Sequence, residues 1–408
     1  PREAPVAQPK GFLGQMAVSG YQPPITVRGD DVAEQRGEGK PVDPELKGFI
    51  LLPGTQTLFR VGGYVKLDAI YDFKPIGSYD SFITSEIPLV PPESNYGRHV
   101  NLHAKQTRLN VDFRRDTPIG TARLFIEGDF YGDQSFGFET GSYQPRLRHA
   151  FGELANFGVG YTYTTFMDAD ALPDTLDFEG PGAAPFLFTP QLRYTYPFNP
   201  NFKVSAAIEG AKSEVTTPVG ISTERAPDIA LRARYEGEKG HVQLSGVFRR
   251  LDYTDGAGQA DNAFGSGVQL AGLLKTWGDD YLVASGVYGK GIARYISDIA
   301  GTGSDAVVDP SGNLEALTAK GGYAAYTHYW TPKLRTTAVA GVLNMDNKDF
   351  QPGSAFKQSQ YYSGNLIWNP YGSLALGVEY LWGRLESFDG TARNANRLQM
   401  SAQYDFVR

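Results

Sequence analysis

Residues 59–73 alternate strictly between two kinds of side chain. The odd-numbered positions are apolar or small, whereas Arg60, Lys66, Asp68 and Asp72 put four charges on the positions between them. Strict alternation predicts a β-strand with one apolar and one polar face. The stretch spans 15 residues, more than twice the length of a common strand of about 5–6 residues. We therefore expect a long strand that separates two unlike environments.

The same alternation recurs from residue 58 to the end of the chain. Leu109, Val111 and Phe113, for example, alternate with polar or charged residues over positions 108–114. Further apolar rows are Ala122, Leu124, Ile126 and Phe130; Phe157, Val159, Tyr161 and Tyr163; Leu192, Tyr194 and Tyr196; Val204, Ala206 and Ile208; Ile229, Leu231, Ala233 and Tyr235; Val242, Leu244 and Phe248; Leu374, Leu376, Val378, Tyr380 and Trp382; and Leu398, Met400, Ala402, Tyr404 and Phe406. Strand-like composition also occurs at 264–277, 280–292, 317–331, 333–345 and 358–369, where the pattern leaves the facing of the side chains open. With the segment that carries Arg146 and Arg148, taken as the fourth strand, these segments predict 16 strands.

The connections between the predicted strands alternate in length. Tight turns are expected at RDTP near 116, ANFG at 155, PFNPN at 197, EGEKG at 236, WGDD at 277, WTPK at 330 and WNPYG at 368. Longer polar connections are expected at 74–104, 132–144, 167–189, 212–227, 254–263, 293–316, 346–357 and 386–395. Short periplasmic turns and long extracellular loops are typical of outer-membrane barrels. An even number of strands would place both ends of the barrel on the periplasmic side.

These patterns predict an all-β protein, a closed antiparallel transmembrane β-barrel in the bacterial outer membrane. In hydrocarbon every backbone N–H and C=O needs a partner, so a sheet that spans the membrane must close on itself. The apolar rows would face lipid and lipopolysaccharide, while the polar rows would face a wet lumen. Aromatic residues near the expected strand ends, such as Trp277, Trp330 and Trp368, suit the membrane interface.

Composition narrows the class of partner. A formal net charge of -7 argues against nucleic acid. No run of about 18 apolar residues occurs, so no transmembrane helix is expected. The absence of cysteine fits either a reducing compartment or an envelope protein that avoids thiols in an oxidising space. The chain begins at Pro1 without an apolar leader, which favours a processed N-terminus.

The first 57 residues differ from the rest of the chain. They are polar, contain scattered Pro and Gly, and show no period. We therefore divide the chain into a non-barrel segment, 1–57, and a barrel, 58–408. The segment is either a periplasmic leader or a partial plug of the barrel.

Arginine recurs on the polar rows. The candidate pore-lining residues are Arg108, Arg114, Arg123, Arg146, Arg148, Arg193, Arg232 and Arg234, and Arg249 could join them. Arginine is always charged and presents a planar fork to carboxylates, so these residues would form a wall that gathers anions. The alternative is that they form structural ion pairs with Asp112, Glu127, Asp129 and Glu209.

The connection at 167–189 is a candidate for a loop that narrows the pore. Its acidic residues are Asp168, Asp170, Asp174, Asp177 and Glu179. If this connection folds into the barrel, its acids would face the arginines and create a transverse field. The alternative is an ordinary acidic loop outside the barrel.

Three stretches resemble the DcaP-like family of trimeric outer-membrane porins: LPGTQTLFRVGGYVKLDAIYDF, TRLNVDFRRDTPIGTARLFIEGDFYG and LRHAFGELANFGVGYTYTTFMDADALPDTLDFEGPGAAPFLFTPQLRYTYPF. They cover the first six predicted strands, and the third stretch is the most specific. The resemblance implies a homotrimer of 16-stranded barrels that passes small solutes and favours anions such as dicarboxylates. The family often carries an N-terminal coiled coil, which the heptad-free residues 1–57 do not match.

No arrangement of residues in the sequence indicates catalysis. The five histidines are scattered, and the pair His99 and His103 lies in loop-like sequence. We therefore expect no enzyme activity, no cofactor and no metal. The predicted function is a porin for passive diffusion of small hydrophilic solutes, favouring small anions. The alternatives are a plugged transporter or receptor gated by the N-terminal segment, an outer-membrane enzyme, and a soluble sugar-binding protein.

Overall fold

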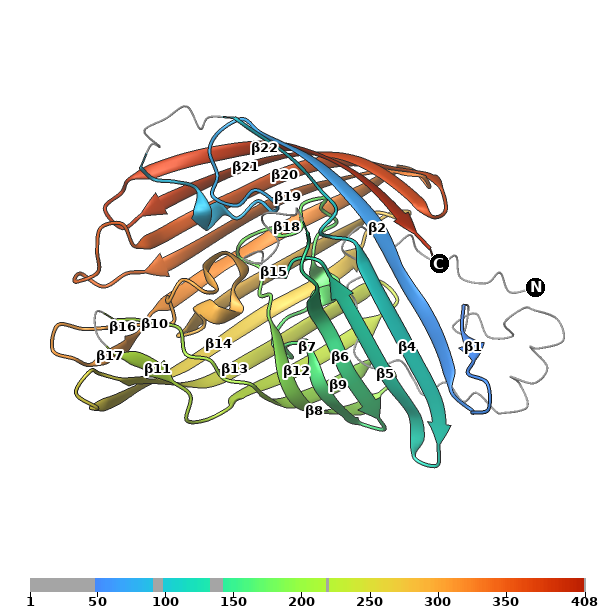
Figure 1. Ribbon diagram of the computed structural model, residues 1–408, viewed down its shortest axis with the longest axis horizontal. Helices are drawn as coiled ribbons and strands as arrows, with labels where there is room; N and C mark the ends of the chain where they lie inside the picture. The colour runs from blue at the N-terminus through green and yellow to red at the C-terminus, as the bar shows by residue number, and fades with distance from the viewer. Residues whose placement is uncertain (1–47, 91–97, 133–141, 218–219, 407–408) are drawn as a thin grey trace.

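The computed structural model describes residues 48–90, 98–132, 142–217 and 220–406. Sixteen antiparallel strands form one closed barrel (Figure 1). The wall strands are β2 (Leu58–Asp72), β4 (Arg108–Thr117), β5 (Gly120–Asp129), β6 (Arg146–Leu154), β7 (Phe157–Tyr163), β8 (Phe188–Asn199), β9 (Phe202–Glu209), β12 (Asp228–Gly237), β13 (Gly240–Thr254), β14 (Ala260–Lys275), β15 (Tyr281–Lys290), β18 (Thr318–Thr331), β19 (Leu334–Asp346), β20 (Phe356–Tyr371), β21 (Leu374–Ser387) and β22 (Ala392–Asp405). The barrel closes where β2 pairs with β22, from Tyr64 opposite Asp405 to Asp72 opposite Arg397. The predicted fold class and strand number are confirmed.

Smaller elements sit on this wall or inside it. They are β1 (Ile50–Leu51), β3 (His99–His103), β10 (Val215–Thr216), β11 (Ile221–Thr223), β16 (Ala306–Val308), β17 (Leu314–Ala316) and the single-turn helices η3 (Thr84–Glu86), η5 (Ala169–Ala171), η6 (Ala293–Tyr295) and η7 (Ser297–Ile299). None of the helices in the described ranges has the length and apolar character needed to cross a membrane.

The apolar face of β2 points outward and its charged face points inward, as the alternation in the sequence predicts. In β2, Val65 is 51% exposed on the outside, whereas its neighbours Lys66 and Asp68 are fully buried on the inside. Leu109 and Leu192 on other strands likewise face outward. Apolar side chains on the outside and charges on the inside suit a barrel surrounded by lipid.

All seven predicted tight turns are present at one end of the barrel, here called the turn end. At the other end, the loop end, two connections that we expected to be long are short. Strands β13 and β14 are joined by residues 255–259, and β21 and β22 by residues 388–391. The expectation was wrong because these strands extend further than their apolar rows. Polar residues can continue a ladder once it has left the lipid.

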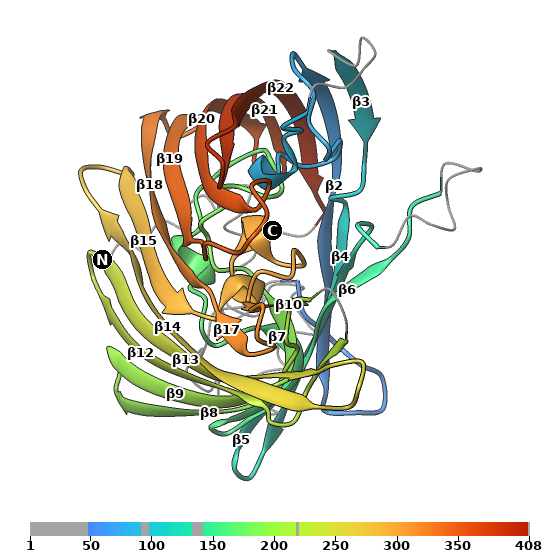
Figure 2. The same ribbon diagram turned by 90° about the vertical axis from the view of Figure 1, so that its left-hand side faces the viewer.

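Three connections from the loop end fold into the lumen (Figure 2). They are residues 73–90, which include η3, residues 164–187, which include η5, and residues 291–317, which include η6 and η7. The expectation that residues 293–316 lie outside the barrel is therefore wrong. Backbone hydrogen bonds join the second and third connections, from Phe186 to Tyr295 and from Ser297 to Ala184.

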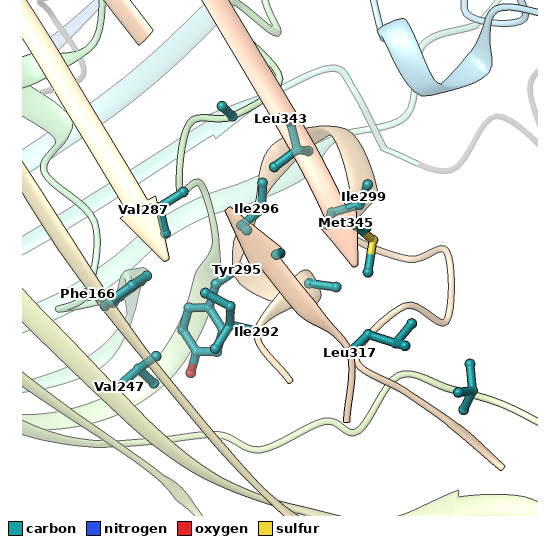
Figure 3. Packing of buried hydrophobic residues seen from close by; sticks show 14 residues of the cluster. Phe166, Val247, Val287, Ile292, Tyr295, Ile296, Ile299, Leu317, Leu343 and Met345 are labelled. Carbon is teal, nitrogen blue, oxygen red and sulfur yellow. The ribbon is translucent and has the colours of Figure 1, made fainter. Parts of the chain in front are cut away.

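An apolar cluster anchors these inward connections (Figure 3). Phe166, Tyr295 and Ile296 from the connections pack against wall residues such as Val287 of β15 and Leu343 of β19. Full burial of a side chain of this size is worth about 1.5–3 kcal/mol. This part of the inner wall is thus apolar, although we expected a wet and charged lumen throughout.

Candidate functional site in the lumen

The connection between β7 and β8, residues 164–187, crosses the lumen and is called the lumen loop below. Side chains of six wall strands hydrogen-bond to its backbone. They are Gln243 of β13, Tyr323 of β18, Asn365 of β20, Glu379 of β21, Gln399 of β22 and Lys66 of β2. Because β18, β20 and β21 stand on the far side of the ring from β7 and β8, the lumen loop runs from one wall to the opposite one.

The five predicted acids of the lumen loop lie in three different places. Asp168 and Asp170 bind the guanidinium of Arg234 at 2.9 and 2.6 Å. Asp174 pairs with Arg335 of β19 at 2.6 Å. Asp177 and Glu179 contact the other two inward connections, since Asp177 accepts from the backbone N–H of Phe82 and Glu179 from the hydroxyl of Ser297. Only the first two acids therefore face the predicted arginines.

Three of the eight predicted arginines are held by acids of β5. Arg148 binds Glu127 and Asp129 at 3.0 Å each, and its guanidinium lies 4.9 Å from the ring centre of Phe188. Arg108 lies 3.6 Å from Glu127, and Arg146 lies 2.6 Å from Asp129. Arg108 and Arg148 are almost completely buried, so they contact protein rather than a permeating solute. For these residues the structure matches the alternative of structural ion pairs.

The other five predicted arginines line the wall between the lumen loop and the turn end. Arg114 is paired in register with Arg123, and Arg123 with Glu153. Glu153 is in register with Gly158 of β7, which is in register with Arg193. These four strand pairings place Arg114, Arg123 and Arg193 in one row across the wall.

In register, Arg193 is followed by Ala207 of β9 and Ala230 of β12, and the cations Lys203, Arg232 and Arg234 lie two to four positions nearer the turn end on these strands. We call the inward-facing charges of this region the wall cluster, and its cations are Arg60, Arg114, Arg123, Arg193, Lys203, Arg232 and Arg234. The strand acids among them are Asp112, Glu153 and Glu236. Seven cations against three strand acids leave this wall positive before the lumen loop is counted.

A narrow cavity of about 30 Å³ lies between the wall cluster and the lumen loop. Arg193, Arg232 and Asp170 are among the residues that line it. Arg232 donates to the hydroxyl of Ser205 at 3.1 Å, and no acid of the described ranges lies within 4.0 Å of it. Its Nε has no hydrogen-bond partner there. Among the described residues, Arg232 and Arg60 are thus the cations of the wall cluster with no carboxylate within 4.0 Å.

The lumen loop carries two carboxyl groups with opposite pKa shifts. Burial alone would raise the pKa of Asp168, but the hydrogen bond from His241 and the charges of His241 and Arg234 lower it. Burial raises the pKa of Glu179 to about 7, and the nearby Asp177 and Asp298 add to the effect against the hydrogen bond from Ser297. Asp168 thus keeps its negative charge near the wall cluster, whereas Glu179 titrates near neutral pH.

The sequence did not identify several charged lumen residues. Arg397 makes two hydrogen bonds, of 2.7 and 3.0 Å, to Asp72 across the closing strand pair. Arg335 lies in a segment whose facing was left open. Arg249, which we left uncertain, binds Asp228 at 3.0 Å and Asp305 at 2.8 Å. The sequence feature that could identify such residues is arginine at alternate positions of a strand. This feature does not identify the partners of these arginines, because the partners are far away in the sequence.

The predicted absences stay predictions. His99 stacks on Tyr79, and His103 lies 3.1 Å from the carbonyl oxygen of Asp80. In the part of the chain that the structure describes, no three His, Asp or Glu side chains are grouped to hold a metal ion. Residues 1–47 lie outside the described residues, so the choice between a leader and a partial plug for residues 1–57 is not tested.

The chain is similar to known outer-membrane proteins. Residues 51–406 match a family model described as DcaP outer membrane protein. The crystal structure of the outer membrane channel DcaP of Acinetobacter baumannii has a TM-score of 0.77 and 23% identity, covering 88% of this chain and 99% of that chain. An anion-selective porin from Comamonas acidovorans has a TM-score of 0.55 and 12% identity, covering 86% of this chain and 100% of that chain. OmpT of Vibrio cholerae in its trimer form has a TM-score of 0.52 and 13% identity, covering 85% of this chain and 99% of that chain. No curated protein sequence matches this chain.

Proposed function

We propose a specific transport function for this chain, which belongs to the DcaP outer membrane protein family. Membership makes the protein a porin-type channel of the bacterial outer membrane, and the resemblance and location expected from the sequence are confirmed. Our proposal is that this channel passes small hydrophilic solutes by passive diffusion and favours small anions such as dicarboxylates.

The arginine row of the wall cluster is the observation that carries this proposal. Arg114, Arg123 and Arg193 are placed in one row by the strand register, and Arg232 has no acid within ion-pair distance among the described residues. Guanidinium groups bind carboxylates with two parallel hydrogen bonds. Low-dielectric walls focus the field of such a row and raise the local concentration of anions.

The lumen loop gives this field a direction. Asp168 and Asp170 neutralise Arg234, and Glu153 lies 3.4 Å from Arg193, whereas Arg232 lines the cavity with no acid within 4.0 Å among the described residues. A dicarboxylate that passes the loop would bind Arg232 and compete with Glu153 for Arg193. Neutral sugars gain no comparable interaction, so the proposed order of preference is dianion, monoanion and neutral solute.

Single-channel reversal potentials in a salt gradient test this proposal. The double variant Arg193→Gln/Arg232→Gln should lower the ratio of anion to cation permeability. A unit charge about 7 Å from the ion path contributes about 0.6 kcal/mol in water, so we expect about a threefold loss per arginine. The matched control is Arg115→Gln/Lys275→Gln, which removes two exposed charges near the turn end.

Two results would contradict the proposal. The first is cation selectivity in the unmodified channel. The second is a double variant whose permeability ratio equals that of the control. A loss in the double variant alone would assign the selectivity to Arg193 and Arg232.

We also infer that the protein is a homotrimer in contact with membrane lipid and lipopolysaccharide, and that it binds no nucleic acid. The inference of a trimer is based on the family resemblance, and one structural neighbour is described as a trimer form. Native mass spectrometry in a mild detergent should give three times the 44.6 kDa chain mass. A monomer under conditions that preserve the folded barrel would contradict this inference.

A further inference from the structure

Basic side chains are unevenly distributed on the outer surface of the barrel. Five of them project from the loop-end part of strands β13–β21: Arg250, Lys290, Lys320, Lys357 and Arg384. Four of these side chains are between 43% and 49% exposed, and Lys290 is also exposed. We call these five residues the cationic belt.

Four of the five belt residues lie at one level with respect to the membrane, and Lys357 lies further toward the loop end. Counted along the strands from the turn end, Arg250 is 10 residues from Gly240, Lys290 is 9 from Tyr281 and Arg384 is 10 from Leu374. Lys320 and Lys357 are 11 and 14 residues from the turn ends of β18 and β20. A tilted strand needs about 9–11 residues to cross the hydrocarbon region. The belt is therefore located where the strands leave the hydrocarbon at the loop end.

Aromatic residues support this assignment. Phe248, Tyr288 and Trp382 each precede a belt residue by two positions and therefore lie on the same outer face. At the opposite side of the membrane, Trp277, Trp330 and Trp368 are exposed near the turn end. Aromatic side chains favour both membrane interfaces. Each of these three belt residues thus projects just beyond the interfacial aromatic ring, at the level of lipid head groups.

Among the described residues, β4–β9 and β12 carry no equivalent belt on their outer face. Their outward positions toward the loop end are apolar, among them Leu109, Ile126, Leu192, Ile208 and Ile229. This difference indicates that β13–β21 face a charged layer that β4–β9 and β12 do not face.

The acids beside the belt leave it positive. Asp252 binds Arg250, Asp346 binds Lys320, and Glu386 binds both Lys357 and Arg384. Within the described ranges no acid lies within 4.0 Å of Lys290. The pair of Lys320 with Asp346 is exposed on both sides, and such pairs contribute about 0–1 kcal/mol, so a phosphate group can exchange for that carboxylate at little cost. Asp252 is buried, so Arg250 keeps its partner.

We propose that the cationic belt binds the phosphate groups of lipopolysaccharide in the outer leaflet. Phosphate accepts several charge-assisted hydrogen bonds from Lys and Arg. A basic residue near an anionic membrane surface contributes about 1 kcal/mol, or about fivefold in affinity. This proposal depends on the outer-membrane location but not on the anion selectivity of the pore.

The test uses the purified full-length protein in detergent and native mass spectrometry with bisphosphorylated lipid A. The belt variant is Lys290→Gln/Lys320→Gln/Arg384→Gln, and we expect it to bind lipid A about 100-fold more weakly than the unmodified protein. The control variant Lys239→Gln/Lys275→Gln/Lys333→Gln removes three exposed charges near the turn end. It should bind within about twofold of the unmodified protein, because its charges lie on the other side of the membrane.

Two further probes separate the lipid from its phosphate. Dephosphorylated lipid A should bind the unmodified protein and the belt variant equally. Inorganic phosphate at millimolar concentration should not displace bound lipid A, because it lacks the acyl chains that rest on the aromatic residues. Equal binding of lipid A by the belt and control variants would overturn the proposal, and so would displacement by inorganic phosphate alone.

Folding and pore function are checked independently. Retarded migration of unheated barrels in a denaturing gel reports folding, and the single variant Lys290→Gln keeps the test available if the triple variant does not fold. The belt variant should keep the permeability ratio of the unmodified channel, because its substitutions lie on the outer face. A loss of lipid binding without a change in ion selectivity therefore tests this proposal apart from the proposed function.

Discussion

The two halves of the barrel wall differ in where they place apolar side chains and charges. In the short half, β4–β9 and β12, strands of 7–12 residues carry arginines and acids inside and apolar side chains outside. In the long half, β13–β22, strands of 10–16 residues carry apolar residues such as Val247 and Leu343 inside and the cationic belt outside. One barrel therefore combines an inner wall rich in charge with an inner wall that carries an apolar cluster beside single ion pairs such as Arg335 with Asp174.

The inward connections explain how both walls are stable. Apolar surface left in a wet lumen would cost about 25 cal/mol per Å². Residues 291–317 cover this surface with Tyr295, Ile296 and Ile299. The charged wall needs no such cover, because water, the lumen loop and its own acids satisfy its side chains. Protein segments thus cover much of the inner face of the long half, whereas the wall cluster lies mainly along the short half.

Tyr295→Ala should have the largest effect. Tyr295 is completely buried, and its hydroxyl donates to Asp228 at 2.8 Å. Replacing a large buried aromatic residue by alanine costs about 3–5 kcal/mol. We expect hydrogen exchange of residues 291–317 to accelerate by more than about 100-fold while the wall strands stay protected.

Tyr288→Ala is the matched control for Tyr295→Ala. Tyr288 lies on β15 and faces outward, with 58% of its surface exposed. Its removal should leave the exchange of residues 291–317 unchanged. Similar acceleration in both variants would mean that the apolar cluster is not what holds the connection in the lumen.

Glu179→Gln should have an intermediate, pH-dependent effect. Burial raises the pKa of Glu179 to about 7 from an ordinary value of 4.5. When the junction of the lumen loop with residues 291–317 opens, the carboxyl group returns to its ordinary pKa. Between pH 4.5 and 7 the open state is then ionised while the closed state is protonated. The closed junction therefore loses stability as the pH rises from 4.5 to 7. The loss is at most about 3 kcal/mol, and above pH 7 the stability no longer changes with pH.

Hydrogen exchange of the lumen loop at several pH values, corrected for the intrinsic rate, measures this effect. The unmodified protein should open more readily at pH 7 than at pH 5, and Glu179→Gln should remove the difference. Asp170→Asn is a suitable control, because Asp170 lies in the same loop but pairs with Arg234. An unchanged pH dependence in Glu179→Gln would assign the titration to another group.

Asp346→Asn should have the smallest effect of the three. It breaks the exposed pair between Asp346 and Lys320 at the loop end of the long half. Exposed pairs contribute about 0–1 kcal/mol, so the midpoint of denaturant unfolding should barely move. In contrast, Arg335→Met removes one partner of the buried pair with Asp174 and should cost about 3–5 kcal/mol. A large loss in Asp346→Asn would contradict the assignment of this surface to the solvated head-group region.

The alternating pattern of the sequence was sufficient to predict the strands of the short half and the tight turns at the turn end. In that half, one face meets lipid and the other meets charge, so alternation of period two directly assigns residues such as Leu109 and Arg114 to opposite faces. Tight turns were also predictable, because short connections between antiparallel strands are local.

The facing of β14, β15 and β18–β20 and the partners of the lumen charges, in contrast, became clear from the tertiary structure. Val339 and Leu343 point inward while Val342 points outward, and alternation cannot distinguish two apolar faces. Ion pairs such as Arg335 with Asp174 join residues 161 positions apart. Such pairs depend on the closure of the barrel and on connections folding into it, and these arise from burial of apolar surface across the lumen rather than from any local pattern in the sequence.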